Sequence, residues 1–395
     1  MRTLESIAEI SGGGTPSRTN PTYFGGGISW ATPTDVTALR DMYIERTKET
    51  LTEAGLKGSS ANLLPPGAVL LTSRATIGYT AVAKVPICTN QGFVNFKCGP
   101  ELEPEYLAYW LRSKKPLLER LANGATFKEI SRGTVRKLEI ELPNRIEQRR
   151  VVDLLSRADN IVRMRREAEQ KAKEIIPALF LDMFGDPATN PKGWKVRNLP
   201  NVLSEPFKNG LYLSKEHYAD EGTTDGVEMI HMSDAFYGEV RRGKLRRVTA
   251  TTELLKPYLL THYDLLVARR SLNWEGAAKL CRLPPSNEPI VFESSFIRLR
   301  PDPEQLETDY LYYYMNSPRT RAAFVEGRIS GITISGINQA ALSTIPVMVP
   351  DLEYQRRFFE SVTGIRSISA SQTAALETAG LAFQSLLAGV FGEAQ

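Results

Sequence analysis

Residues 241–247 form a dense run of side chains that could bind an anion. Five of these seven residues are cationic, and the glycine among them permits a turn: Arg241, Arg242, Lys244, Arg246 and Arg247. A basic loop of this kind can neutralise DNA phosphates. A run of charges can also be a solvated surface without a ligand. The sequence alone leaves both interpretations open.

Two further segments follow apolar, strand-like runs and combine the residue types that read the edges of bases. They are Arg74, Thr76 and Tyr79 in the first segment, and Arg269, Arg270, Asn273 and Trp274 in the second. Arginine and asparagine form paired hydrogen bonds with guanine and adenine in the major groove. Asn90 and Gln91 offer additional amide donors. An internal salt bridge that fixes the loop is the alternative role for Arg74 and Arg269.

The glycine-rich segment 12–17 precedes the first globular region. Its glycines permit a nest of backbone N–H groups that binds anions, with the hydroxyls of Thr15 and Ser17 beside it. The same glycines could only shape a turn. We include Thr15 and Ser17 among the candidate DNA contacts.

Evidence for catalysis in the sequence is slight. Asn20-Pro21-Thr22-Tyr23 is similar to the Asn-Pro-Pro-Tyr motif of adenine-N6 methyltransferases. That chemistry also needs a cofactor-binding glycine loop within an alternating β/α sheet, and no such alternation is visible. Three histidines, His217, His231 and His262, form no readable pair with a nucleophile. We therefore predict a chain without catalytic or metal-binding residues and without a cofactor of its own.

A duplicated segment must position these loops. Pro143 to Arg150 reads as a proline, four further residues and Gln-Arg-Arg, and the same pattern starts at Pro350. Phe-Gly closes the first copy at residues 184–185 and the second at 391–392, so both ends share an offset of 207 residues. A loop does not need a fixed length, whereas a long helix used as a spacer does.

Local signals favour a helix in both copies. Proline stops the preceding strand, and Asn144 with Glu147 fits a helix cap. Apolar or small residues then recur at heptad-like spacing, which suits two long helices packed on each other. Roughly 35 helical residues span about 50 Å. Pro177 could kink the first helix near its end.

The repeat divides the 395 residues into four parts. Residues 1–142 and 186–349 are predicted as two domains, and residues 143–185 and 350–395 as a central and a distal spacer helix. Short apolar strands and one helix in each domain predict an α+β fold with a curved β-sheet. The expected architecture has two such domains separated by two long antiparallel helices, related by a pseudo-twofold axis.

Composition sets weaker limits on the protein. A hydrophobic content of 42% is typical of a soluble globular chain, and a net charge of +4 permits nucleic-acid binding without indicating it. Three cysteines form no disulfide or zinc pattern. We find no signal peptide and no run expected to cross a bilayer, which predicts a cytoplasmic protein.

Taken in this order, the motifs resemble the specificity subunits of type I restriction-modification systems, over essentially the whole chain. The motifs are Gly-Gly-Thr-Pro-Ser at 13–17, the segment from Trp30 to Asp35, residues 71–78, the two Gln-Arg-Arg helix starts, and residues 181–187 running into Gly193-Trp194. The second half departs from this pattern, because Asn209-Gly210-Leu211-Tyr212 replaces the Gly-Gly-Thr-Pro signature.

The resemblance implies two target-recognition domains that each read one half of a bipartite DNA sequence. It also implies two adenine-N6 methyltransferase subunits as partners, which would carry S-adenosylmethionine, and optional endonuclease subunits. The helix starts are the expected docking region for these partners: Gln148, Arg149, Arg150, Gln355, Arg356 and Arg357. These six residues could instead pin the domains to the helices. A self-contained methyltransferase or nuclease, or a coiled-coil scaffold without a DNA role, are the competing hypotheses.

Overall fold

The computed structural model describes residues 1–395 except 125–127, 221–222, 236–237, 332 and 393–395. The chain divides into two compact units, which we call unit 1 (Met1–Glu169 with Ser371–Gln395) and unit 2 (Gln170–Ala370). Each unit therefore contains part of both long helices. The predicted boundaries at 142, 185 and 349 instead assign whole helices to separate segments.

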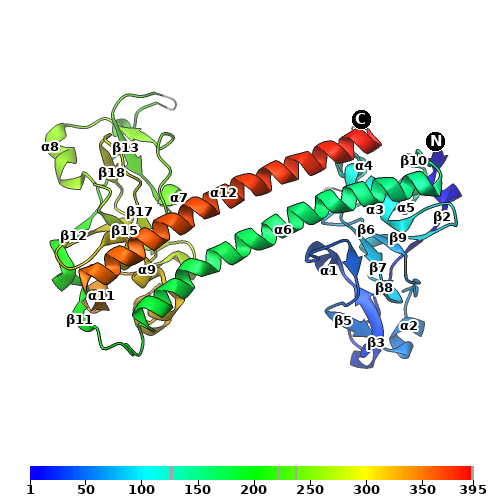
Figure 1. The fold of residues 1–395 in the computed structure, drawn as a ribbon, viewed down its shortest axis with the longest axis horizontal. Coiled ribbons are helices and arrows are strands. Elements are labelled where there is room, and N and C mark those ends of the chain that lie inside the picture. Colours follow the sequence, from blue (N-terminus) through cyan, green and yellow to red (C-terminus); the bar gives the residue numbers. More distant parts are fainter. Residues whose placement is uncertain (125–127, 221–222, 236–237, 332, 393–395) are drawn as a thin grey trace. The chain divides into compact units, whose positions relative to one another are not determined.

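Unit 1 is built on a five-stranded sheet in the order β2-β9-β6-β7-β4, with a three-stranded sheet β5-β3-β8 and a two-stranded sheet β1-β10 (Figure 1). The strands are β1 (Arg2–Thr3), β2 (Ala8–Gly12), β3 (Phe24–Ala31), β4 (Tyr43–Ile44), β5 (Glu49–Leu51), β6 (Val69–Thr72), β7 (Thr80–Ala83), β8 (Ile87–Thr89), β9 (Phe93–Cys98) and β10 (Glu139–Ile140). The short helices are η1 (Leu4–Ser6), η2 (Pro21–Tyr23), α1 (Pro33–Thr37), α2 (Glu53–Lys57), α3 (Pro104–Ser113), α4 (Lys115–Leu121) and α5 (Arg132–Arg136).

Unit 2 repeats this topology. Its sheets have the orders β12-β19-β15-β17, β14-β13-β18, β11-β21 and β16-β20. The strands are β11 (Lys195–Asn198), β12 (Leu203–Asn209), β13 (Val227–Ile230), β14 (Arg247–Val248), β15 (Leu265–Ala268), β16 (Arg270–Ser271), β17 (Leu280–Arg282), β18 (Ile290–Phe292), β19 (Phe296–Pro301), β20 (Ser335–Gly336) and β21 (Pro346–Val349). Both units contain a corresponding parallel pair, β3 with β8 and β13 with β18, and unit 1 has a further parallel pair, β4 with β7.

The helices of unit 2 follow the same plan, with α9 (Thr308–Asn316) corresponding to α3. The others are η3 (Leu199–Val202), η4 (Lys215–His217), α7 (Met232–Ala235), α8 (Thr252–Leu255), η5 (Lys256–Tyr258), η6 (Trp274–Gly276), α10 (Pro318–Thr320), η7 (Arg321–Val325), η8 (Glu326–Arg328) and α11 (Gln339–Ser343). This match between the two units confirms the α+β internal repeat expected from the sequence.

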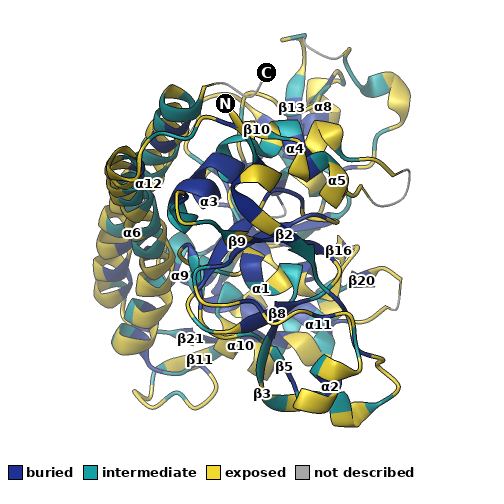
Figure 2. Cartoon of the chain, turned by 90° about the vertical axis from the view of Figure 1, so that its right-hand side faces the viewer, coloured by how far each residue is buried: buried dark blue, intermediate teal, exposed yellow. Residues whose placement is uncertain are grey.

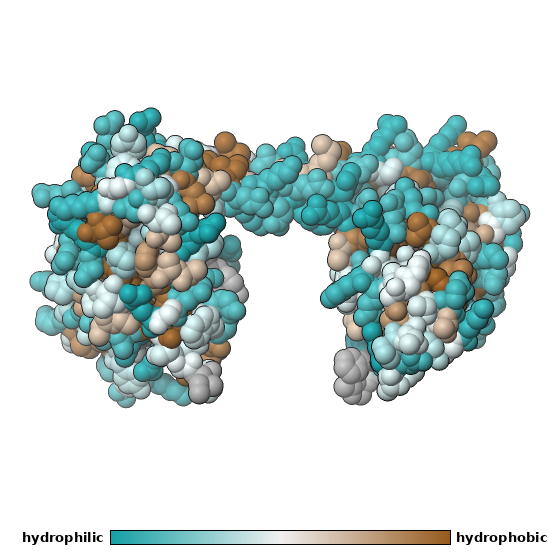
Figure 3. Space-filling view, turned by 90° about the horizontal axis from the view of Figure 1, so that it is seen from below, coloured by the Kyte–Doolittle hydropathy of each residue, from teal (hydrophilic) through white to brown (hydrophobic). Residues whose placement is uncertain are grey.

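The two long helices are α6 (Arg145–Phe184) and α12 (Leu352–Phe391), each of 40 residues. The α6 helix continues through Pro177, and the side chain of Asn144 caps its start by accepting a hydrogen bond from Glu147 N at 3.1 Å. In unit 1 the helices run antiparallel, because Arg165 donates to Gln372 at 3.1 Å while Leu155 shares a core with Phe383. Figure 3 shows mostly hydrophilic side chains along the exposed stretch of helix.

The apolar stripe of these helices packs mainly on the globular cores, and not only along a seam between helices. Figure 2 shows this burial pattern, with buried residues gathered in the sheets and in α3 and exposed residues along the helices. In unit 1 the rings of Tyr106 and Phe391 meet edge to face at 5.3 Å. In unit 2 Phe184 meets Tyr310 in the same way at 4.8 Å. Ile175, expected within the stripe, is exposed.

The sequence led us to expect no run that crosses a bilayer, and the composition of α12 bears on this expectation. Among the described residues, α12 is long and apolar enough to pass a composition test for a membrane-spanning helix. Small residues such as alanine and glycine, together with leucine and phenylalanine, give it this composition. The core helix of a soluble protein passes the same test, so it is weak support for a membrane span.

A buried glutamine fixes the start of each long helix to its globular unit. Gln148 Nε2 donates to the carbonyl oxygens of Glu101 and Pro143, both at 2.8 Å, and its Oε1 accepts from Glu103 N at 2.9 Å. Gln355 makes the same three contacts with Gln305, Pro350 and Glu307. Both side chains are fully buried, so they pin the domains to the helices and offer no surface to a partner.

Replacing Gln148 by alanine is expected to destabilise unit 1 by about 2–4 kcal/mol, because one N–H and two carbonyl groups lose their partner in a buried site. Urea unfolding followed by circular dichroism measures the loss. The matched control is Gln170→Ala, which truncates an exposed glutamine of the same helix and should stay within about 0.5 kcal/mol. Equal stability of the two variants would contradict the role of Gln148.

Candidate nucleic-acid interface

Four loop segments of unit 1 come together where strands β2, β6 and β9 end. They are residues 13–15, 73–75, 90–92 and, of the fourth segment, 123–124 and 128–130, and we call them the loop site of unit 1. Ser73 joins two of the segments, since its N–H donates to Gly92 O at 2.8 Å and its carbonyl accepts from Ile130 N at 2.9 Å. Gly14 N donates to Thr89 O at 2.9 Å, which fixes the glycine-rich segment beside residues 90–92.

Unit 2 contains the same arrangement in residues 210–212, 269–271, 293–295 and, of the fourth segment, 330–331 and 333–337, which we call the loop site of unit 2. Arg269 takes the place of Ser73, with its N–H donating to Ser295 O at 2.8 Å and its carbonyl accepting from Ile337 N at 3.1 Å. Leu211 N donates to Phe292 O at 2.9 Å, as Gly14 does to Thr89. The backbone of the loop site is therefore repeated, although its side chains differ.

A close backbone approach explains why both loop sites have a glycine in their first segment. A Cβ atom on Gly13 would lie 2.0 Å from Asn90 O, and one on Gly210 would lie 2.0 Å from Glu293 O. No side chain fits at such a distance, so these positions require glycine. Gly210 therefore takes the structural place of Gly13, although the Gly-Gly-Thr-Pro signature is missing from the second half.

The strand register shows which residues of the two loop sites correspond to each other. Thr72 lies opposite Phe93, and Ala268 lies opposite Phe296. Arg74 bridges to Glu129 and Arg270 pairs with Gly336, 207 residues further on. Aligning the apolar runs of the sequence at residues 70–73 and 265–268 pairs Arg74 with Arg269. This prediction is wrong by one residue, because the strand pairing makes Arg270 the structural counterpart of Arg74.

Several predicted DNA contacts meet in these loop sites. In unit 1 they are Thr15, Arg74, Asn90 and Gln91, with Thr76 directly after; in unit 2 they are Arg269 and Arg270, with Asn273 and Trp274 directly after. Arg74, Thr76, Gln91 and Arg270 are exposed. A cleft of about 590 Å³ borders the loop site of unit 1, and Arg132 and Arg136 line it.

Some of these polar side chains already have partners within the protein. Asn90 Oδ1 accepts from Gly92 N at 2.9 Å, and Asn273 Oδ1 accepts from Gly276 N at 2.8 Å. Thr15 donates to Gln91 Oε1. Arg74 lies 3.8 Å from the carboxylate of Glu129, and both side chains stay about half exposed. An exposed ion pair of this length contributes little stability, so Arg74 can exchange partners.

Two predicted DNA contacts of unit 1, Ser17 and Tyr79, lie apart from its loop site. Ser17 Oγ shares a hydrogen bond with Thr19 at 2.8 Å, in the turn that leads to η2. Tyr79 is partly exposed, and the ammonium of Lys115 lies 4.1 Å from the centre of its ring. Ser17 and Tyr79 therefore stay predicted DNA contacts on the surface, apart from the four segments of the loop site.

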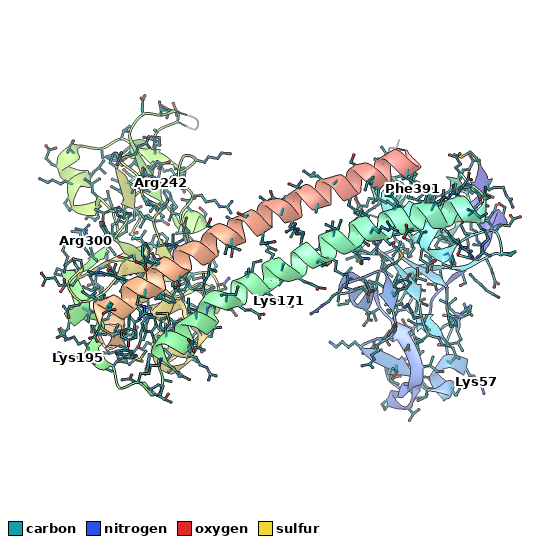
Figure 4. The ribbon with its side chains drawn as sticks, in the orientation of Figure 1. Lys57, Lys171, Lys195, Arg242, Arg300 and Phe391 are labelled. Atoms are coloured by element: carbon teal, nitrogen blue, oxygen red, sulfur yellow. The ribbon has the colours of Figure 1, made fainter. Side chains whose placement is uncertain are left out.

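The basic run 241–247 belongs to a different part of unit 2, at the edge of the sheet β14-β13-β18. Arg242, labelled in Figure 4, turns inward and donates to Glu228 Oε2 at 2.9 Å and to Glu288 O at 2.9 Å. Arg246 lies over the ring of Tyr218 at 5.4 Å. Arg241 and Lys244 are exposed. The run is therefore partly structural and partly available to phosphates.

The residues predicted to bind partners also fall into two groups, those paired within the chain and those that are exposed. Arg149 binds Glu103 at 2.7 Å and Arg356 binds Glu307 at 3.1 Å, which reinforces the two buried glutamines. Arg150 and Arg357 are exposed at equivalent positions of α6 and α12. Of the six candidates, these two offer the least committed side chains for a partner.

The residues that suggested catalysis have local structural roles. Asn20 Oδ1 accepts hydrogen bonds from Thr22 N and Thr22 Oγ1, so its amide caps η2. His231 is buried against Tyr218 OH at 3.0 Å, and burial lowers the pKa of its imidazole. Burial raises the pKa of the Cys88 thiol to about 11. Within the part of the chain that the structure describes, no cluster of three or more His, Cys, Asp or Glu side chains could hold a metal ion.

Comparison with known proteins identifies the class of protein. The family model for the type I restriction modification DNA specificity domain matches residues 1–174 and again residues 191–376. The chain therefore belongs to the type I restriction-modification specificity family, and it contains the family's domain twice. This duplication corresponds to the two loop sites described above.

Individual relatives agree with this classification. The chain is 34% identical over 220 residues to the type I restriction enzyme MjaIX specificity subunit of Methanocaldococcus jannaschii. It is 22% identical over 340 residues to the StySPI specificity subunit of Salmonella potsdam, which covers 81% of this chain and 72% of that protein. The match to the M. jannaschii protein covers 51% of this chain, which spans about half the length of that relative.

Solved structures share the fold. A chain from a study of complex assembly and conformational transition in the type I R-M system superposes with a TM-score of 0.61 at 19% identity, covering 100% of this chain and 97% of the other. The S subunit from M. genitalium superposes with a TM-score of 0.51 at 16% identity, covering 99% and 95%.

Arg241 and Arg242 are neighbours in the basic run. Substituting each of them tests whether its charge stabilises the fold or stays available to a ligand. Arg242→Ala removes the ion-pair partner of the fully buried carboxylate of Glu228, which also accepts a hydrogen bond from Gly243 N, so the free energy of unfolding should fall by about 3–5 kcal/mol. The matched variant Arg241→Ala truncates an exposed side chain and should change it by less than about 0.5 kcal/mol. Urea unfolding measures both, and equal effects would contradict the inward role of Arg242.

Proposed function

We propose that this chain is the DNA sequence-specificity subunit of a type I restriction-modification complex, in which each unit reads one half of a bipartite target. The observation that carries the proposal is the repeated loop site. The two copies have the same backbone hydrogen bonds, whereas the side chains they display differ. A shared scaffold with different side chains suits two readers of different half-sites.

The chemistry of the exposed side chains supports DNA as the ligand. Arg74 and its counterpart Arg270 are exposed in the two loop sites, and guanine O6 and N7 are the usual acceptors of an arginine fork in the major groove. Arg241 and Lys244 supply exposed charges for phosphates, which position a protein on DNA without reading its sequence. A net charge of +4 is compatible with this role.

The partners in this proposal are two adenine-N6 methyltransferase subunits, and endonuclease subunits where the system includes them. S-adenosylmethionine would bind the methyltransferase subunits, and this chain would hold neither a cofactor nor catalytic residues. The exposed Arg150 and Arg357 at the helix starts are the proposed docking contacts. Such a complex acts on chromosomal DNA, so we propose a cytoplasmic location.

Variants of the two exposed arginines should weaken recognition of one half-site each. With the full chain and its co-purifying subunits, Arg74→Ala and Arg270→Ala are expected to reduce affinity for the cognate duplex about tenfold or more, and to relax selectivity at one position. Fluorescence anisotropy on duplexes with one altered half-site measures this. The matched control is Arg46→Ala, an exposed arginine outside the loop site.

Lys244→Ala is the complementary variant, because a phosphate contact should weaken binding on every sequence and lower the slope of affinity against salt by about one. Loss of selectivity in Lys244→Ala, or its retention in both arginine variants, would place the reading residues elsewhere.

The purified chain alone should transfer no methyl group from S-adenosylmethionine to DNA, whereas the complex with its partner subunits should methylate adenines. A radiolabelled methyl-transfer assay compares the two preparations. Methyl transfer by the chain alone would favour the competing hypothesis of a self-contained methyltransferase. A chain that binds no DNA with or without partners would favour a scaffold.

A further inference from the structure

Four large apolar side chains are exposed around the loop site of unit 2. Tyr212 and Leu272 are each 82% exposed, Ile334 is 50% exposed and Trp274 is 44% exposed. Single apolar side chains on a surface are ordinary, but a group of them marks an interaction site. We call these four residues the apolar patch.

The strand pairing brings the members of the patch together. β16 pairs with β20 through Arg270 opposite Gly336 and Ser271 opposite Ser335. Leu272 and Ile334 are the next residues on the two strands, so both side chains leave the same end of the ladder. Trp274 follows two residues later, in the turn that Asn273 caps.

Tyr212 joins the patch from another segment. Gly210, two residues before it, contacts the backbone of Glu293 and donates its N–H to Phe296 O at 3.0 Å. The same turn accepts the N–H of Arg269 through Ser295 O. The segment that carries Tyr212 therefore lies beside the segment that carries Arg269 and Arg270.

Charge next to the patch indicates the nature of its partner. Arg270 is exposed and Arg269 is half-buried, and they lie two and three residues before Leu272 in the chain. A partner that suits both features is anionic and still carries apolar groups. In the major groove of DNA, the 5-methyl group of thymine is the apolar feature among the polar base edges.

The spacing of the side chains fits a row of base pairs. Ser271 is buried between the exposed Arg270 and Leu272, so those two side chains share one face of the strand. Alternate residues of a strand lie about 6.6 Å apart, which is close to two base-pair steps of about 3.4 Å each. An arginine contact to a base and an apolar contact two steps away can thus be made together.

The loop site of unit 1 presents different side chains. Thr15 stands where unit 2 has Tyr212, and the exposed Thr76 follows its ladder where unit 2 has Leu272. Phe127, which corresponds to Ile334 at an offset of 207 residues, lies outside the described residues. The described counterparts are polar, so the two sites differ in the chemistry that they offer.

We infer that the apolar patch of unit 2 contacts thymine 5-methyl groups in the major groove of its half-site. This inference rests on the proposed function and adds how one of the two half-sites is recognised. Unit 2 reads its half-site through the methyl groups of A·T pairs together with the arginine contact. Unit 1 reads its half-site through polar contacts.

Deoxyuridine provides the test, because replacing thymine by uracil removes only the methyl group. The full chain, together with the subunits that co-purify with it, is bound to DNA duplexes. These duplexes carry the target sequence, as identified from the methylated adenines of the host's DNA. Uracil is placed at each thymine of one half-site and then of the other. One half-site should lose affinity by roughly fourfold per contacted methyl group, and the other should change little.

Protein variants then assign the effect to the patch. Leu272→Ala should weaken binding of the thymine duplex by a similar factor and should abolish the penalty for uracil, since a lost contact cannot be lost twice. Leu254→Ala, which truncates an exposed leucine of α8 in the same unit, should keep the full penalty. Leu272 is exposed, so this variant is expected to fold.

The outcomes separate the inference from the proposed function. If the wild-type complex shows no sequence-selective binding, the proposed function fails. If it binds selectively but tolerates uracil in both half-sites, the inference is wrong while the proposed function stands. A uracil penalty that persists in Leu272→Ala also overturns the inference. A 2-aminopurine base placed in the half-site reports unstacking of the bases. If this base unstacks on binding while uracil has no effect, the patch inserts between bases and does not contact methyl groups.

Discussion

The buried glutamine at the start of each long helix is the contact on which each unit depends. Its amide satisfies one N–H group and two carbonyl groups that would otherwise be unpaired in the interior. A helix could slide or rotate along an apolar surface at modest cost, because dispersion contacts are not directional. Three hydrogen bonds at one side chain fix both its position and its rotation.

With the helix start fixed, the aromatic contacts further along acquire a defined register. Tyr106 with Phe391 and Tyr310 with Phe184 are the same contact in the two units, each made by the other long helix. Each core is thus completed by residues from both helices. The fixed offset of 207 residues at both ends of the repeat follows from this, since an insertion within a helix would rotate one contact away from its partner.

The loop sites show how one scaffold can display two surfaces. Backbone hydrogen bonds and a required glycine hold the four segments in each unit, so their side chains are free to differ without loss of the fold. Charged residues near the sites divide by burial. Arg242 satisfies an interior carboxylate, whereas Arg241 and Lys244 beside it remain in solvent. Membership of a basic run in the sequence therefore does not show whether a given cation is free to bind a phosphate.

The sequence by itself determined the features that depend on local patterns. Proline, a capping asparagine and apolar spacing define the two helices, and a shared offset reveals the repeat. These signals act within a few turns of the chain, where spacing in sequence is close to spacing in space. Apolar runs at residues 68–72 and 92–98 predict strands in the same way, and β6 and β9 lie there.

Tertiary structure alone decided which side chains are available. Gln148 and Gln355 look like surface residues beside arginines, yet folding buries them against distant carbonyl groups. The equivalence of Arg74 with Arg270 depends on which strands pair, and Leu272 and Ile334 come to lie side by side only because β16 pairs with β20. Burial and pairing are set by contacts between residues far apart in the chain, which no local pattern encodes.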